Sequence, residues 1–99
     1  MSVRIELDQA RIAEFCQRNH IRRLALYGSV LTDEFGSDSD VDVLVEFESG
    51  HSVGLIRMAT LETELSHIIG RKVDLRTPGD LSRYFRDQVM ASAEVQYAR

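Results

Sequence analysis

Residues 28–42, which read GSVLTDEFGSDSDVD, decide the fold of this 99-residue chain. The segment begins with a Gly-Ser pair directly after an apolar run, residues 21–27, that we expect to form a strand. Gly28 and Ser29 therefore lie where a strand ends, and a glycine there lets a phosphate approach the main chain. If residues 30–33 begin a helical turn, its first free amides also point at a bound anion. The segment thus predicts a phosphate-binding turn.

A second expected strand, residues 40–47, carries a pair of carboxylates. Asp40, Asp42 and Leu44 alternate with three valines, so the two-residue period of a strand places both aspartates on one face. Carboxylate oxygens are the ligands that Mg²⁺ takes beside the phosphates of a nucleotide. Two such ions, about 3.5–4 Å apart, can hold the attacking and leaving oxygens of an in-line displacement. The paired aspartates therefore predict a metal site for a nucleoside triphosphate.

A third carboxylate lies in the next short strand, residues 72–76, which read KVDLR. Asp74 alternates with Val73 and Leu75, and we predict that it completes the site as a metal ligand or as the base for an acceptor hydroxyl. Arg76 shares the face of Asp74. It can supply a cation for the triphosphate, or it can pair with Asp74 or face solvent.

Two other interpretations of the acidic segment compete with a metal site. Gly, Ser and Asp are common turn formers, so the segment could be a solvated acidic loop. Asp38, Asp40 and Asp42 also resemble the start of an EF-hand, but Val43 and Ser49 stand where that loop requires Gly and Glu. The apolar strands on both sides of the segment favour the metal site.

These residues resemble the G-S-x10-D-x-D signature of the DNA polymerase beta-like nucleotidyltransferase superfamily. Gly28-Ser29 is followed by ten residues, then by Asp40-Val41-Asp42, and Asp74 comes in a later strand. With its small size, the chain is similar to the minimal nucleotidyltransferases, the antitoxin half of HEPN–MNT toxin–antitoxin pairs. The resemblance implies that Gly28 and Ser29 contact the triphosphate of ATP. It also implies that Asp40, Asp42 and Asp74 hold Mg²⁺, as two ions.

The function implied by this resemblance is Mg²⁺-dependent transfer of AMP from ATP to a tyrosine of a cognate HEPN ribonuclease toxin, held in a hetero-oligomer. Two alternatives stay open: a non-catalytic antitoxin that neutralises its toxin by binding, and a small-molecule nucleotidyltransferase that works with a helical subunit in trans. Many relatives carry an arginine shortly after the Gly-Ser pair, whereas this chain has no Lys or Arg between Arg23 and Arg57. That departure favours the binding antitoxin, and the intact carboxylates favour the enzyme.

Length, composition and charge limit the kinds of protein that this chain can be. Ninety-nine residues that are 43% hydrophobic and 28% charged indicate one globular domain over residues 1–99. No stretch approaches the roughly 20 apolar residues of a membrane span, and the N-terminus lacks the apolar core of a signal peptide, so we expect a cytoplasmic protein without a membrane partner. Residues 32–48 carry seven acidic side chains and no basic one. They would repel a nucleic-acid backbone, so we expect a protein or small-molecule acceptor.

The predicted fold is α/β (α+β), a small mixed sheet with helices mainly on one face and the aspartates on the other. We expect a first helix from an Asp8 cap to about Asn19, and a second helix that ends near Gly70. The second helix would pack through Leu55, Met58, Ala59, Glu62 and Leu65. A third helix, single or broken, would run from Leu81 to about Tyr97 with Phe85, Val89 and Met90 inward.

Two remaining groups of side chains bear on partners and metals. Phe35, Tyr84, Phe85 and Tyr97 are candidate partner-facing aromatics, with the core as the alternative. His20, His51 and His67 are scattered along the chain without ligand spacing, so the sequence predicts no histidine site. Cys16 is expected to pack in the core.

Overall fold

The computed structural model describes residues 5–36 and 38–99. The elements follow one another as α1 (Gln9–Arg18), β1 (Ile21–Tyr27), the 3₁₀ turn η1 (Gly28–Leu31), β2 (Val41–Phe47), α2 (Leu55–Ile69), β3 (Val73–Arg76), the 3₁₀ turn η2 (Pro78–Asp80), α3 (Arg86–Ser92) and β4 (Glu94–Ala98). The predicted α/β architecture is confirmed, and the strands begin and end within a residue or two of the predicted positions, except at the C-terminal end.

The four strands form one mixed sheet in the order β3-β2-β1-β4. β1 runs antiparallel to both of its neighbours, β2 and β4, whereas β2 and β3 are parallel. The register places Tyr27 beside Asp42, and Asp42 beside Asp74. Three side chains that are distant in sequence therefore form a row across β1, β2 and β3 on one face of the sheet.

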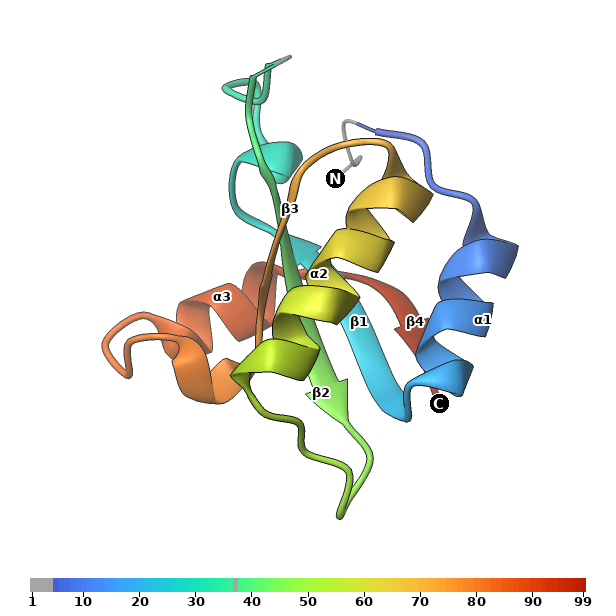
Figure 1. Cartoon of the computed structure of the whole chain (residues 1–99). Coiled ribbons are helices and arrows are strands. Elements are labelled where there is room, and N and C mark those ends of the chain that lie inside the picture. Colours follow the sequence, from blue (N-terminus) through green and yellow to red (C-terminus); the bar gives the residue numbers. More distant parts are fainter. Residues whose placement is uncertain (1–4, 37) are drawn as a thin grey trace.

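The opposite face of the sheet is covered by α1 and α2, which lie side by side (Figure 1). Alternation in β2 turns its three valines toward these helices, and all three are fully buried. Ile12 and Phe15 of α1 and Leu61 and Leu65 of α2 meet them, each without exposed surface. The expected arrangement, with the main helices on one face and the aspartates on the other, is confirmed.

Local capping sets where the helices begin and end. The Asp8 carboxylate accepts a hydrogen bond of 3.2 Å from the main-chain amide of Arg11, which satisfies a free donor of the first turn, as predicted. At the other end of α1, the buried Asn19 side chain donates to the Phe15 carbonyl at 2.9 Å. α2 ends at Gly70, whose left-handed φ of 81° is the usual geometry of a glycine C-cap.

The face that α2 buries differs from the predicted one. Leu55, expected inward, is 89% exposed, and Ala59 is also exposed. The prediction is confirmed for Leu65, which is buried, and for Met58 and Glu62, which are partly buried. The helix also packs through Leu61, which was not predicted. Met58, Leu61 and Leu65 are three and four residues apart, so they lie on one side of the helix. This side is more apolar than the predicted one, and it faces the sheet.

The predicted C-terminal helix, from Leu81 to about Tyr97, is wrong at both ends. Only Arg86–Ser92 are helical, and Glu94–Ala98 form β4, which pairs with the free edge of β1. Phe85 is 50% exposed instead of inward, while Val89 and Met90 are partly buried. An unpaired sheet edge offers a row of main-chain donors and acceptors, and this long-range pairing prevails over the helix propensity of the segment.

We expect Phe15→Ala to lower the free energy of unfolding by about 3–5 kcal/mol, because the ring is fully buried between α1 and the sheet and its removal leaves a cavity. Urea denaturation followed by circular dichroism measures the change. Gln17→Ala, at an exposed position of the same helix, is the matched control and should change stability by less than about 0.5 kcal/mol. Equal effects of the two substitutions would contradict this packing.

Candidate active site

The three predicted carboxylates gather at one end of the sheet. Asp42 in β2 and Asp74 in β3 are register partners on neighbouring strands, which lie about 4.8 Å apart in a sheet. Asp40 comes just before β2 and on the same face, and its carboxylate lies 4.0 Å from the Lys72 ammonium. The Asp40 and Asp74 side chains are 47% and 37% exposed, so both can meet a ligand from solvent.

Asp42 is the carboxylate whose ionisation the fold most disfavours. Partial burial raises its pKa above the ordinary value, and the negative charges of Asp74 and Asp40 add to this effect, while the Arg76 charge opposes it. A divalent cation between these carboxylates would remove both the repulsion and the desolvation cost. The donor set, three carboxylates in reach of solvent, therefore fits a hard cation such as Mg²⁺.

Gly28 touches the Asp42 carboxylate through its main chain. Its φ is +78°, and a Cβ atom built on it would lie 3.3 Å from Asp42 Cγ and closer still to Oδ2. Both the left-handed backbone and the lack of space require glycine at this position. The Gly-Ser turn and the Asp42 carboxylate, which are separate in the sequence, are thus one continuous surface.

The turn that follows Gly28 is held in place from both sides. The Ser29 carbonyl accepts two hydrogen bonds of 2.9 Å from Thr32, one from its amide and one from its hydroxyl. Val30 and Leu31 anchor the turn to the core, in which both side chains are buried. Ser29 therefore sits on a short, rigid 3₁₀ turn at the end of β1, where the sequence places the phosphate-binding turn.

Tyr27, a residue that sequence reasoning did not select, borders two hollows. One hollow, of about 270 Å³, is lined by Asp42, Asp74 and Arg76, and by Phe85 at its rim. The other, of about 670 Å³, lies between the Gly-Ser turn and α3. Burial and then the Asp42 charge raise the pKa of Tyr27 to about 12, so its hydroxyl stays protonated and can donate. The sequence could have indicated Tyr27 as a site residue, because it is the last residue of the strand before the Gly-Ser turn.

Arg76 forms an ion pair with Asp74. Its Nε and one terminal nitrogen donate to Asp74 Oδ2 at 3.2 and 3.1 Å, and these bonds raise the arginine pKa further. Of the alternatives that the sequence left for Arg76, the structure selects pairing with Asp74. The guanidinium is 46% exposed, so it remains accessible to an anionic ligand beside the carboxylates.

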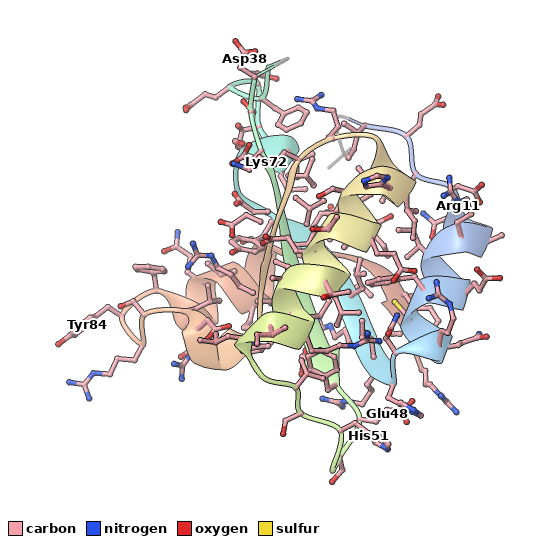
Figure 2. All side chains as sticks on the ribbon, viewed as in Figure 1. Arg11, Asp38, Glu48, His51, Lys72 and Tyr84 are labelled. Atoms are coloured by element: carbon pink, nitrogen blue, oxygen red, sulfur yellow. The ribbon has the colours of Figure 1, made fainter. Side chains whose placement is uncertain are left out.

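The four candidate partner-facing aromatics divide into two pairs. Tyr84 is 84% exposed and extends away from the body of the molecule (Figure 2). Phe85 is half exposed at the rim of the carboxylate hollow. Phe35 and Tyr97 instead pack against the core, and the Arg71 guanidinium lies 4.5 Å above the Phe35 ring. Tyr84 and Phe85 therefore remain candidates for partner contact, and Phe85 is the one next to the carboxylates.

The prediction that the histidines are scattered is wrong for two of them. His20 and His51 stack with ring centroids 4.0 Å apart, at the end of the sheet that is opposite to the carboxylates. Their spacing in the sequence could not predict this contact, because it is the pairing of β1 with β2 that brings them together.

No helix in the described part of the chain is long and apolar enough to cross a membrane.

Asp42→Asn should stabilise the protein in EDTA, because the amide removes a charge that the fold disfavours. A carboxyl whose folded pKa is raised contributes stability below its unfolded pKa and loses it as the pH rises through the folded value. The gain in Tm should therefore be largest at pH 7 and above, and should shrink as the pH falls toward 4. Thermal unfolding across this range measures it. Asp40→Asn, which is more exposed, should gain less, and a lower Tm for Asp42→Asn at pH 7 would contradict the electrostatics.

Comparison with known families identifies this arrangement. The family model described as a nucleotidyltransferase domain matches residues 10–95. A candidate protein adenylyltransferase of Methanocaldococcus jannaschii is 29% identical over 83 residues, covering 84% of this chain and 87% of the relative. The protein adenylyltransferase MntA of Thermococcus cleftensis is 39% identical over 62 residues, covering 63% of this chain and 61% of MntA.

Solved structures share the fold. A toxin–antitoxin structure with AMP-PNP matches with a TM-score of 0.75 at 20% identity, covering 94% of this chain and 75% of the matched chain. A tri-AMPylated Shewanella oneidensis HEPN toxin in complex with its MNT antitoxin matches with a TM-score of 0.67 at 19% identity, covering 92% and 70%. These likenesses show that the fold is shared. The family match over residues 10–95 shows that the chain, which is similar to MntA, belongs to the nucleotidyltransferase domain family.

Proposed function

We propose that this chain is an Mg²⁺-dependent antitoxin that transfers AMP from ATP to a tyrosine of a cognate HEPN toxin. The observation that carries the proposal is the contact of the Gly28 main chain with the Asp42 carboxylate, which is in register with Asp74. This contact unites a phosphate-binding turn with a set of metal ligands. The relative MntA, named a protein adenylyltransferase, and the complex of an AMPylated HEPN toxin with its MNT antitoxin support the choice of reaction and partner.

Asp40, Asp42 and Asp74 are the residues that would hold Mg²⁺, through their accessible oxygens. When bound, the ions supply positive charge against the negative charge that develops around the α-phosphorus. The raised pKa of Asp42 supports this role, because three carboxylates in one place are costly without a cation. The same charge makes a nucleic-acid acceptor unfavourable, so we assign the acceptor to a protein.

The triphosphate would lie along the Gly-Ser turn. Gly28 leaves room for it beside Asp42, and Ser29 offers a hydroxyl and an amide on a rigid turn. Arg76 offers the positive charge that the segment after the turn does not carry in this chain. Tyr27 has a pKa of about 12, so its hydroxyl is protonated and can donate a hydrogen bond into the same hollow.

The acceptor tyrosine would enter from the side of Phe85, which is half exposed and lines the carboxylate hollow. Its hydroxyl oxygen forms a bond to the α-phosphorus while the bond from that phosphorus to the bridging oxygen breaks, so pyrophosphate leaves along the turn. Asp74 would take the hydroxyl proton. The transfer would place a bulky charged group on the toxin and silence it.

One observation favours a second candidate, an antitoxin that neutralises its toxin by binding alone. Both described hydrogen bonds from the Arg76 side chain go to Asp74 Oδ2, so one of the three proposed metal ligands is already neutralised. The absence of an arginine shortly after the Gly-Ser pair points in the same direction. In that case the exposed aromatics would bind the toxin, and the carboxylate hollow would have no role in transfer.

Incubation of the cognate helical toxin with this chain, ATP and Mg²⁺ should add mass in steps of one AMP, measured by intact-mass spectrometry. Asp42→Asn should slow the addition by about 100-fold or more, since removal of a group that stabilises transition-state charge costs about 10²–10³ in rate. Asp38→Asn, at an exposed acidic position of the same segment, should leave the rate unchanged. EDTA should abolish the addition for every variant.

Two results would contradict the enzyme. If Asp42→Asn transfers AMP as fast as the unmodified chain, the carboxylates are not the metal site. If the unmodified chain forms a tight complex with the toxin and adds no mass, the binding antitoxin is the correct function, and the ion pair of Arg76 with Asp74 becomes the leading reason.

Gly28→Ala should lower transfer by about 100-fold, because the added methyl must displace the Asp42 carboxylate and a displacement of about 1 Å can cost that much. The left-handed φ should also cost about 1–2 kcal/mol of stability. Gly36→Ala is the matched control, since a Cβ there meets nothing within 4 Å. The AMP-transfer rate and the Tm of both variants test this, and equal behaviour would disprove the close contact.

A further inference from the structure

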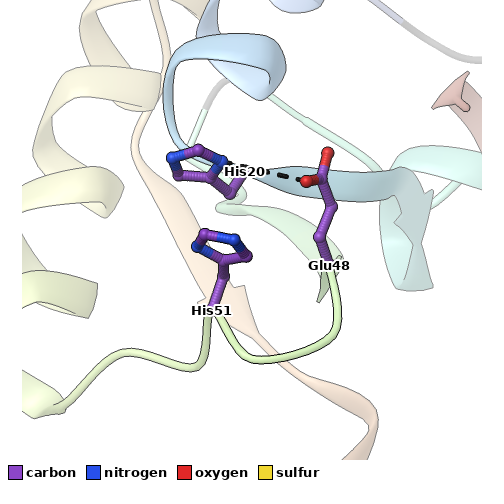
Figure 3. A group of neighbouring side chains, drawn as sticks. All are labelled: His20, Glu48 and His51. Atoms are coloured by element: carbon purple, nitrogen blue, oxygen red, sulfur yellow. Dashed lines mark ion pairs between the residues drawn. The ribbon is translucent and has the colours of Figure 1, made fainter.

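His20, Glu48 and His51 form a cluster of metal-ligating side chains outside the active site (Figure 3). His20 lies in the turn between α1 and β1, and the other two lie in the loop between β2 and α2. The two imidazole rings stack with an interplanar angle of 14°. One ligand atom from each of the three residues lies within 4.8 Å of the others.

The main chain holds these three residues together. The Glu48 amide donates to the His20 carbonyl at 2.8 Å, and the His51 amide donates to the Glu48 carbonyl at 3.0 Å. His20 adopts a φ of 56°, which directs the chain from α1 into β1. The side chains therefore stay close even when they rotate, because their backbones are connected by hydrogen bonds.

The Glu48 carboxylate is oriented for a ligand between the histidines. Its Oε2 accepts from the Arg99 guanidinium at 2.6 Å, while its Oε1 faces His20 Nδ1 at 3.8 Å. An outer partner that holds one oxygen and leaves the other directed at the site is the arrangement that orients carboxylate ligands in metal centres. The ion pair with Arg99 thus fixes Glu48 without using the oxygen that faces the imidazoles.

We propose that His20, Glu48 and His51 bind a divalent transition-metal ion, with Zn²⁺ as the preferred ion. Two imidazole nitrogens and a carboxylate oxygen are a common set of zinc ligands, with a fourth position open to water. Bonds of about 2.0–2.2 Å require the three ligand atoms to approach one another further, which the exposed His20 and His51 side chains can do by rotation. Imidazole ligands disfavour Mg²⁺, so the site is chemically distinct from the carboxylate centre.

The strand register separates this site from the active site. Ile21 pairs with Phe47 at one end of β1 and β2, and Tyr27 pairs with Asp42 at the other. Seven residues of extended strand place the two sites about 20 Å apart. A bound ion would join the start of β1 to the end of β2, and through Arg99 it would also reach the end of β4. Its effect would be on stability, and the inference does not depend on the proposed transfer reaction.

Isothermal titration of Zn²⁺ into the metal-stripped, tag-free chain tests the proposal. We expect one ion per chain and a rise in Tm, both retained in an Asp40→Asn/Asp42→Asn background that disables the carboxylate centre. His20→Asn and His51→Asn should weaken binding by at least about tenfold, since even outer partners cost about 10–100-fold. Asparagine tolerates the left-handed backbone of His20, so folding should be preserved, which circular dichroism checks.

His67→Asn is the matched control, because His67 is an exposed histidine on α2 outside the cluster. It should bind Zn²⁺ as the unmodified chain does. The proposal is overturned if Zn²⁺ does not bind the Asp40→Asn/Asp42→Asn chain. It is also overturned if the affinity survives His20→Asn and His51→Asn, or if His67→Asn loses as much affinity as they do.

Discussion

The close approach of the Gly28 main chain to the Asp42 carboxylate is the constraint on which the active site depends. It exists because β1 and β2 are antiparallel and in a register that ends β1 at the level where the Asp42 side chain emerges. A Cβ atom at position 28 would occupy the space of that carboxylate. Glycine is therefore required by the tertiary contact as well as by its left-handed φ, and the proposed phosphate-binding turn and the proposed metal ligands become neighbours through this one residue.

The site is assembled at an electrostatic cost. Asp40, Asp42 and Asp74 are brought to one face, and in the absence of a cation their mutual repulsion and the partial burial of Asp42 disfavour its ionised form. The ion pair of Arg76 with Asp74 reduces this cost in the free protein. A protein of this size has a small margin of stability, so the cost indicates that the carboxylates serve a ligand. In the proposed function, Arg76 substitutes for the cation in the free protein and contacts phosphate when a nucleotide is present.

The rest of the fold separates stability from function. α1 and α2 bury the valine face of the sheet and provide the core, whereas the opposite face carries the ionisable row of Tyr27, Asp42 and Asp74. The half-exposed Phe85 side chain lies beside that row, where a partner would meet it. The histidine cluster lies at the far end of the same two central strands, so the sheet carries two chemically different sites without a shared residue.

The sequence by itself determined the elements whose signals are local. The alternation of valines with aspartates predicted β2 and the face of Asp42, the Asp8 cap predicted the start of α1, and the spacing from the Gly-Ser pair to the aspartates predicted the family. Only the tertiary structure decided what long-range pairing controls. Residues 94–98 form a strand because β1 has a free edge with which they pair. α2 packs on the sheet through Leu61. Strand register places Tyr27 beside Asp42 and brings the two histidines together. Local propensity does not encode such contacts, since each depends on a partner distant in the chain.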